Sequence, residues 1–171
     1  MIVADASPLI ALVKLRRLNI LEDLYGGVLI APAVRAETID AGRAIRDPGV
    51  AQLDAAVEDR WLKEVLLTDD ERELALRLYG PSRLGRGEAE SIAVADGRGM
   101  RLIVDDKEAR SVSVAMSVEH IGTAGVFLEA CMRRHLNLAE LETVIRDLGQ
   151  ILWLSPTVVA EVLRLAREVE R

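Results

Sequence analysis

Carboxylates at four places along the sequence could together do chemistry. Asp5 follows the apolar run 2–4, and the adjacent pair Asp105 and Asp106 follows the apolar run 102–104. Glu37 and Glu88 lie where the pattern predicts the first turns of helices. Two carboxylates about 4 Å apart, at an effective dielectric constant near 20, repel each other by roughly 4 kcal/mol. A cluster of them therefore needs protons or a bound cation.

Oxygen-only ligands indicate which cation such a cluster would take. Mg²⁺ and Mn²⁺ prefer carboxylate, water and phosphate oxygens. A site of this kind can activate water for attack on a phosphodiester. Glu90 lies two residues after Glu88 and is rotated by about 200° on a helix, so at most one of the two should face the site directly. We expect that residue to be Glu88.

The elements that must position these acids alternate along the chain. We expect strands at 1–5, 28–32, 100–106 and 117–122, whereas the pattern of 60–67 is compatible with a strand but ambiguous. We expect helices at 7–15, 18–27, 33–42, 46–59, 68–80, 85–99 and 107–116, and three closing helices at 123–136, 137–149 and 155–171. Strands separated by helices predict parallel pairing, hence a three-layer α/β/α domain with a central sheet of four or five strands.

The predicted fold gives the acids a common location. In open parallel sheets, ligands bind beyond the carboxyl ends of the strands, where the strand order reverses. Asp5 and the pair Asp105 and Asp106 come at those ends. Ser7 is the expected N-cap of the first helix, with Pro8 at its first position, and Thr68 with Glu71 predicts a capping box.

Composition restricts the class of protein. The chain has 171 residues, half of them hydrophobic, and five prolines, which predicts a single domain over 1–171. Cys131 is the only cysteine, which excludes an intrachain disulfide and fits a cytoplasmic location. No apolar run reaches about 18 residues, so we expect no membrane partner. A net charge of −6 argues against bulk coating of nucleic acid.

Four segments carry a family resemblance: "VADASPLI", "APAVRAE" ending in Glu37, "GRGEAESIAVA", and "LIVDDKEAR" followed by "GTAG". Together they resemble the PIN domain family of metal-dependent ribonucleases, and most closely its toxin-like prokaryotic branch, related to VapC toxins. The resemblance covers roughly residues 1 to 135, and it implies that 136–171 is a helical C-terminal extension beyond the usual toxin core. Many of these toxins have Asp where this chain has Glu88. They also have Thr and Phe where it has Val104 and Ala109.

The resemblance implies a set of roles. It implies a divalent-metal-dependent endoribonuclease using Mg²⁺ or Mn²⁺, and the toxin of a type II toxin–antitoxin pair. Its metal site would be built from Asp5, Glu37, Glu88 and the pair Asp105 and Asp106. The Ser7 hydroxyl would contact these ligands without binding the metal itself. Which of the two aspartates meets the metal stays open. RNA would be the substrate, with Arg110 touching its phosphates, and an antitoxin protein would be a partner.

Two further interpretations accompany this one. A non-catalytic PIN-like module that binds protein or RNA is the alternative function, and a requirement for divalent ions distinguishes the enzyme from it. The closing helices carry an apolar row, which together with the resemblance predicts a homodimer. The row consists of Val158, Val162, Leu165 and Val169.

Overall fold

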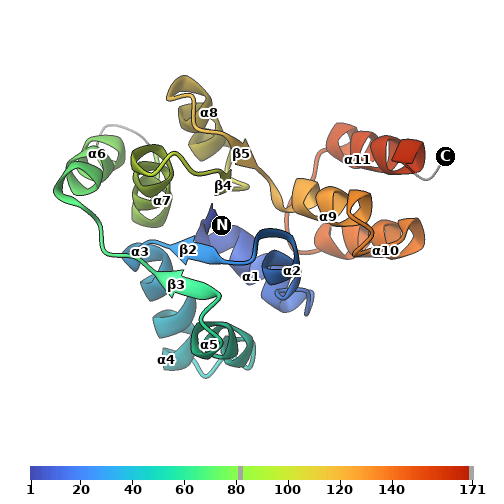
Figure 1. The fold of residues 1–171 in the computed structure, drawn as a ribbon, viewed down its shortest axis with the longest axis horizontal. Helices are drawn as coiled ribbons and strands as arrows, with labels where there is room; N and C mark the ends of the chain where they lie inside the picture. Colours follow the sequence, from blue (N-terminus) through green and yellow to red (C-terminus); the bar gives the residue numbers. More distant parts are fainter. Residues whose placement is uncertain (81–82, 170–171) are drawn as a thin grey trace.

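A central parallel sheet organises the protein. The computed structural model describes residues 1–80 and 83–169. The strands are β1 (Ile2–Ala4), β2 (Val28–Ile30), β3 (Leu62–Glu64), β4 (Leu102–Ile103) and β5 (His120–Ile121). They form one five-stranded sheet in the order β3-β2-β1-β4-β5, and every pairing is parallel (Figure 1). The expected α/β architecture is therefore confirmed, with the ambiguous segment 60–67 supplying the edge strand β3.

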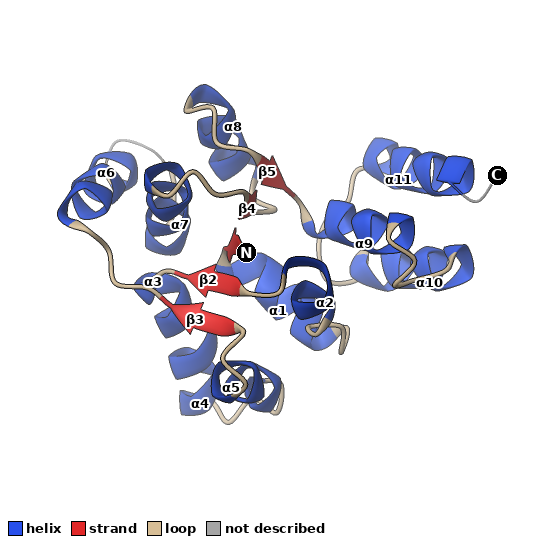
Figure 2. Ribbon diagram, viewed as in Figure 1, coloured by secondary structure: helices blue, strands red, loops and turns tan. Residues whose placement is uncertain are grey.

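Helices flank this sheet (Figure 2). In chain order they are α1 (Ala6–Lys14), α2 (Ile20–Tyr25), α3 (Pro32–Arg35), η1 (Ala36–Asp40), α4 (Ala41–Ala44), α5 (Val50–Glu58), α6 (Asp69–Tyr79), α7 (Arg86–Gly97), α8 (Lys107–Ala115), α9 (Thr123–Met132), α10 (Leu138–Leu148) and α11 (Pro156–Val169). Helix α1 contacts α5 and α9, whereas α7 contacts α6, α8, β1 and β4.

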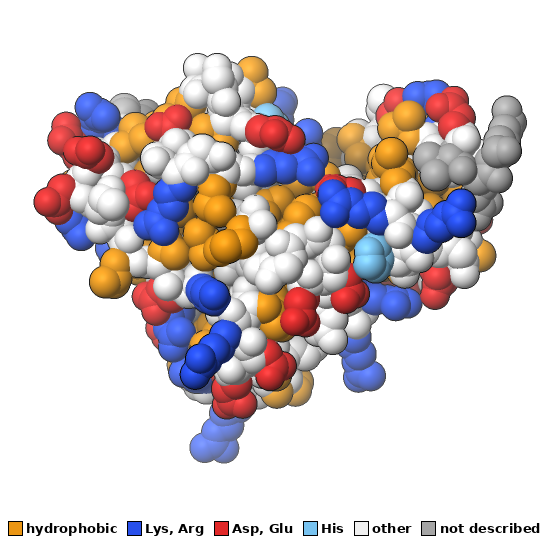
Figure 3. Space-filling model, viewed as in Figure 1, with side chains coloured by type: hydrophobic (Ala, Val, Ile, Leu, Met, Phe, Trp, Pro, Cys, Tyr) orange, Lys and Arg blue, Asp and Glu red, His pale blue; other side chains and the backbone are white. Residues whose placement is uncertain are grey.

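Burial distinguishes the central strands from the edge. All residues of β1, β2 and β4 are buried, as expected for strands covered on both faces. In β3 only Leu62 is buried, and Lys63 and Glu64 are exposed. Charged side chains on an edge strand discourage pairing with another chain. The face drawn in Figure 3 carries intermixed acidic and basic side chains.

Among the helix starts that differ from the prediction, two concern the carboxylates. Helix α1 begins at Ala6, with Asp5 as its N-cap residue, so Ser7 lies inside the helix and Pro8 is its third residue. The first four N–H groups of a helix have no intrahelical partner, so a proline at the third position removes no bond. The segment 33–42 begins its helix at Pro32 and then widens into a π turn, η1, in which the Ala41 N–H bonds to the Ala36 carbonyl. The capping box of Thr68 and Glu71 is present as predicted.

The last helices pack on the body of the protein. Helix α11 contacts α9 and α10, and Arg167 donates a hydrogen bond to Glu142 of α10 at 2.9 Å. Val162 and Ala166 of α11 are buried in the same core as the sheet. Val158, by contrast, is 37% exposed, and Trp153 before the helix is 86% exposed. Among the described helices, none has the length and apolar character needed to cross a membrane.

Candidate metal centre

Asp5 and Asp105 come at the ends of neighbouring strands. Strands β2 and β3 lie on one side of β1, whereas β4 and β5 lie on its other side. The strand order therefore reverses between β1 and β4. The Asp5 N–H donates to the Ile103 carbonyl at 3.0 Å, which fixes the end of β1 against β4. The acids therefore lie at the position where parallel sheets bind their ligands.

The carboxyl group of Asp5 is buried without full compensation. Asp5 is only 2% exposed, and its Oδ1 atom has no hydrogen-bond partner among the described residues. Burial raises the pKa of Asp5 to about 7, although a hydrogen bond from the Ala6 N–H lowers it in part. The charges of Glu88, Glu37 and Asp105 raise the pKa further, so all three lie close enough to act on it.

Asp105 is held in place by one residue at the end of the adjacent strand. Its Oδ1 accepts the Thr123 backbone N–H at 2.8 Å, and its Oδ2 accepts the Thr123 hydroxyl at 2.6 Å. Burial raises the pKa of Asp105, and the two Thr123 bonds and the charge of Arg110 oppose that shift. Thr123 is the first residue of α9, so β5 and α9 together orient this carboxylate.

Asp106 lies differently from its neighbour. It is exposed and caps α8, where its Oδ1 accepts the Ala109 N–H at 2.9 Å. Its charge raises the pKa of Glu88, whereas Asp105 acts on Asp5. The structure thus places Asp105 against the buried end of the cluster and Asp106 at its solvent side.

Glu88 belongs to the cluster and Glu90 does not. Glu88 is half-buried at the start of α7, and its Oε2 accepts the Gly85 N–H at 2.6 Å. Burial raises the pKa of Glu88, and the negative charges of Asp106 and Glu37 raise it further. The hydrogen bond from the Gly85 N–H lowers it in part. Glu90 is buried elsewhere, where its two oxygens accept the Ala33 N–H and the Arg86 Nε–H, each at 2.8 Å.

Glu37 reaches the cluster from the π turn. It is exposed, and its carboxylate lies against the backbone of Gly87. An added Cβ on Gly87 would stand 2.9 Å from Glu37 Oε2, closer than Cβ atoms approach other atoms in real proteins. Single π turns inside helices re-aim side chains and often occur at functional sites. Here the turn lies between α3 and α4 and carries Glu37 towards α7.

The two remaining predicted residues are nearby but peripheral. Ser7 is half-buried in the first turn of α1, two residues after Asp5, and its hydroxyl makes no hydrogen bond within the described part of the chain. Arg110 is exposed on α8. Its charge lowers the pKa of Asp105, which places the guanidinium beside the cluster.

Sequence reasoning assigned no role to two residues that shape this site. Thr123 was visible as the hydroxyl residue that follows the last strand, in the "GTAG" segment. Gly87 was visible as the second glycine of "GRG". Only the folded structure relates Thr123 to Asp105 and Gly87 to Glu37.

The donor set suits a hard divalent cation. Within the described residues, no three acidic, histidine or cysteine side chains converge closely enough to form a ready-made coordination group. The chemistry nevertheless matches, since every group in the cluster is a carboxylate and Asp5 Oδ1 is a buried acceptor without a partner. Mg²⁺ binds through one or two carboxylates and keeps several waters, so it does not require a full protein cage.

Comparison with known proteins identifies the family. A family model described as a PIN domain matches residues 1–168, a span that includes α10 and nearly all of α11. No curated protein and no solved structure matches the chain. PIN domains are in general nucleases, and they generally use divalent metals. With its five-stranded parallel sheet and carboxylates at the strand-order reversal, the chain belongs to the PIN domain family.

Proposed function

We propose that the protein is a divalent-metal-dependent endoribonuclease that hydrolyses phosphodiester bonds in RNA. The observation that carries the proposal is the Asp5 carboxyl group, buried with an unpartnered oxygen amid the charges of three other carboxylates. A fold does not maintain such a group for stability, because burying an uncompensated carboxylate is unfavourable. A bound cation would compensate it.

We assign the metal-binding role to Asp5, Asp105, Glu88 and Asp106. When bound, Mg²⁺ or Mn²⁺ would supply charge stabilisation and a more acidic water. Thr123 fixes both oxygens of Asp105, so this ligand needs no reorganisation. Gly85 restrains one oxygen of Glu88 and leaves the other available.

Glu37 and Arg110 act on the reactants in this proposal. Glu37 is exposed at the mouth of the cluster, where its carboxylate can orient the attacking water and accept its proton. Arg110 presents a guanidinium beside Asp105, in a position to bind a non-bridging phosphate oxygen. The Ser7 hydroxyl, two residues after Asp5, would hydrogen-bond a water molecule close to the carboxylates.

The test compares the natural chain with Asp5→Asn in an RNA cleavage assay, with and without EDTA. Asp5→Asn keeps the size of the side chain and removes its charge. We expect cleavage to fall by orders of magnitude in the variant and to vanish for both proteins in EDTA. Asp70→Asn is the matched control, since Asp70 is an exposed carboxylate on α6 outside the cluster. Cleavage that survives both chelation and Asp5→Asn contradicts the proposal, and RNA binding without cleavage favours the binding module.

The toxin role is a separate proposal within the same activity. It is supported by membership of the PIN family and by the four sequence segments that resemble toxin-like members. We expect induced expression of the natural chain in a bacterial host to arrest growth and Asp5→Asn to leave growth unaffected. Co-expression of a small adjacent gene that encodes an antitoxin should restore growth. Normal growth with an active, well-expressed nuclease contradicts this role.

A further inference from the structure

A cavity of about 500 Å³ opens at the same edge of the sheet as the carboxylate cluster. Its wall includes Pro32, two residues after β2, and Leu66, two residues after β3. Because β2 lies next to β1 in the sheet, the cavity adjoins the ends of β2 and β3, while the carboxylates follow β1 and β4. Helices α6 and α7, which lie side by side (Figure 1), form its other walls, and α7 also carries Glu88.

Large apolar side chains around this cavity are left open to solvent. Leu66 is 85% exposed, Leu76 is 68% exposed and Tyr79 is 52% exposed, and all three line the cavity. Tyr79 lies at the end of α6 and supplies an aromatic ring in a chain with only 3% aromatic residues. Exposed apolar surface around a concave site indicates a ligand with an apolar face.

Two guanidinium groups line the same cavity. Arg86 donates its Nε–H to the buried carboxylate of Glu90, and its terminal nitrogens make no hydrogen bond among the described residues. Arg72 is held by Asp69 at 2.5 Å and by the Leu67 carbonyl at 3.0 Å. Anchored guanidinium groups bind phosphate, and aromatic rings stack on unpaired bases. The lining therefore matches a nucleotide.

We propose that this cavity binds one unpaired base of the RNA substrate, in the nucleotide next to the phosphodiester that lies at the carboxylates. The base lies against Tyr79, and the adjoining phosphate lies at Arg86. The inference rests on the proposed ribonuclease function and names a specificity-determining subsite for it. A second copy of the chain is the rival occupant, since it could cover Leu66 and Leu76. The two guanidinium groups and the location beside the cluster favour RNA.

The experiment measures the affinity of fluorescently labelled single-stranded RNA in EDTA, in an Asp5→Asn background that does not cleave. Tyr79→Ala is compared with Tyr79→Phe, which keeps the ring. Ile45→Ala is the control, since Ile45 is an exposed apolar residue outside the cavity. One stacked base contributes about 1–3 kcal/mol, so we expect Tyr79→Ala to weaken binding by roughly 5- to 150-fold. Tyr79→Phe and Ile45→Ala should bind like their parent.

RNAs that each carry a single abasic nucleotide identify which base of the RNA binds in the cavity. At one position relative to the cleavage site, removal of the base should make the Tyr79→Ala variant and its parent bind equally. Unchanged RNA affinity in Tyr79→Ala overturns the inference. A loss of dimer mass in that variant with unchanged affinity overturns it in favour of an interface between copies.

The same variants separate this inference from the nuclease proposal. If the natural chain never cleaves RNA in Mg²⁺ or Mn²⁺ but the Tyr79 effect on binding holds, the nuclease proposal is wrong and the base site stands. If Tyr79→Ala cleaves RNA with the kcat/KM of the natural chain, the base site is wrong and the nuclease proposal stands. If the natural chain binds no RNA at micromolar concentration, both are wrong.

Discussion

The Glu37 carboxylate lies directly against the backbone of Gly87. A Cβ built on Gly87 would stand 2.9 Å from Glu37 Oε2 and 3.0 Å from Oε1. The π turn that carries Glu37 can therefore approach the first turn of α7 this closely only because residue 87 has no side chain. This contact places Glu37 where its charge acts on both Asp5 and Glu88.

Gly87→Ala should separate activity from stability. The added methyl group displaces the Glu37 carboxylate, so we expect RNA cleavage to fall at least about tenfold, equivalent to 1.4 kcal/mol in the activation free energy. Helical alanine offsets the strain, so the melting temperature should change little. Gly80→Ala is the control, because a Cβ there meets only the Leu76 carbonyl at 3.6 Å. Equal cleavage by Gly87→Ala and the natural chain would show that Glu37 is dispensable.

Asp5→Asn should stabilise the protein in the absence of cations. Because burial raises the pKa of Asp5 from 3.8 to about 7, ionisation disfavours the folded state by up to about 4 kcal/mol above pH 7. This destabilisation is absent below about pH 4 and develops as the pH rises to 7. In EDTA at pH 8 we expect the variant to melt at a higher temperature, and the difference to vanish near pH 4.

Divalent ions should make the natural chain melt at a higher temperature than Asp5→Asn, the reverse of the result expected in EDTA. Mg²⁺ or Mn²⁺ at pH 8 should raise the melting temperature of the natural chain, because a ligand that binds only the folded state stabilises it. Asp5→Asn should respond weakly or not at all. An equal response of both proteins to the ion would remove Asp5 from the set of ligands, whatever the cleavage assay shows.

The Glu71–Arg98 pair predicts a second pH dependence, remote from the carboxylate cluster. Hydrogen bonds from Arg98, the nearest at 2.7 Å, lower the pKa of buried Glu71. The stabilisation is present above the ordinary pKa of 4.5 and is lost as the pH falls through the lower folded value. We expect Glu71→Gln to lower the free energy of unfolding by about 2 kcal/mol at pH 7 and by much less at pH 3. Glu73→Gln, at an exposed pair with Arg77, should have little effect at either pH.

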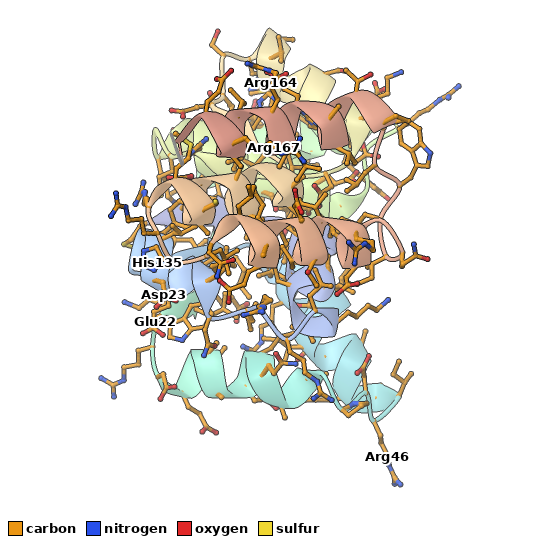
Figure 4. The ribbon with its side chains drawn as sticks, turned by 90° about the vertical axis from the view of Figure 1, so that its right-hand side faces the viewer. Glu22, Asp23, Arg46, His135, Arg164 and Arg167 are labelled. Atoms are coloured by element: carbon orange, nitrogen blue, oxygen red, sulfur yellow. The ribbon has the colours of Figure 1, made fainter. Side chains whose placement is uncertain are left out.

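Arg46→Gly should increase stability. Arg46 adopts φ = 56°, in the left-handed region, and its side chain projects away from the protein (Figure 4). A non-glycine residue there is disfavoured by about 1 kcal/mol, so glycine should raise the free energy of unfolding by up to that amount. Gly26→Ala is the reverse test, since Gly26 has φ = 67° and a Cβ there meets nothing within 4 Å. Urea unfolding should give opposite signs for the two variants.

We also expect the protein to be a homodimer. Trp153 and Val158 leave apolar surface exposed where α10 is joined to α11, although Val162 in the same apolar row is buried within its own chain. Light scattering at tens of micromolar should give about twice the chain mass of 18.8 kDa. A monomer mass would contradict the expectation, and Trp153→Ala should shift the equilibrium towards the monomer.

The sequence predicted the parts of this fold that follow from local patterns. Apolar runs that end in an acid located the ends of β1 and β4, and the alternation of strands and helices predicted their parallel pairing. The start of α1 was misplaced because Asp5 and Ser7 are both good N-cap residues, and only tertiary packing selects between them. The π turn escaped prediction because periodicity does not distinguish it from a regular helix.

The site was harder to predict than the fold. Asp105 and Asp106 are chemically identical neighbours, and what distinguishes them is Thr123, a residue 18 positions further along. Gly87 matters only because Glu37, 50 positions earlier, lies against it. Such pairings depend on how α7 and α9 pack around the sheet, and no local pattern encodes them.

The order of strands also determines when the site comes into being during synthesis. β1 lies in the middle of the sheet, but its neighbour β4 begins at Leu102 and the clamp on Asp105 begins at Thr123. A nascent chain that has exposed only β1, β2 and β3 has Asp5 without the acids opposite it and leaves one edge of β1 unpaired. The ribosome must therefore release most of the chain before the carboxylates assemble. The proposed ribonuclease would therefore stay inactive towards RNA close to the ribosome until most of its chain, through Thr123, has been translated.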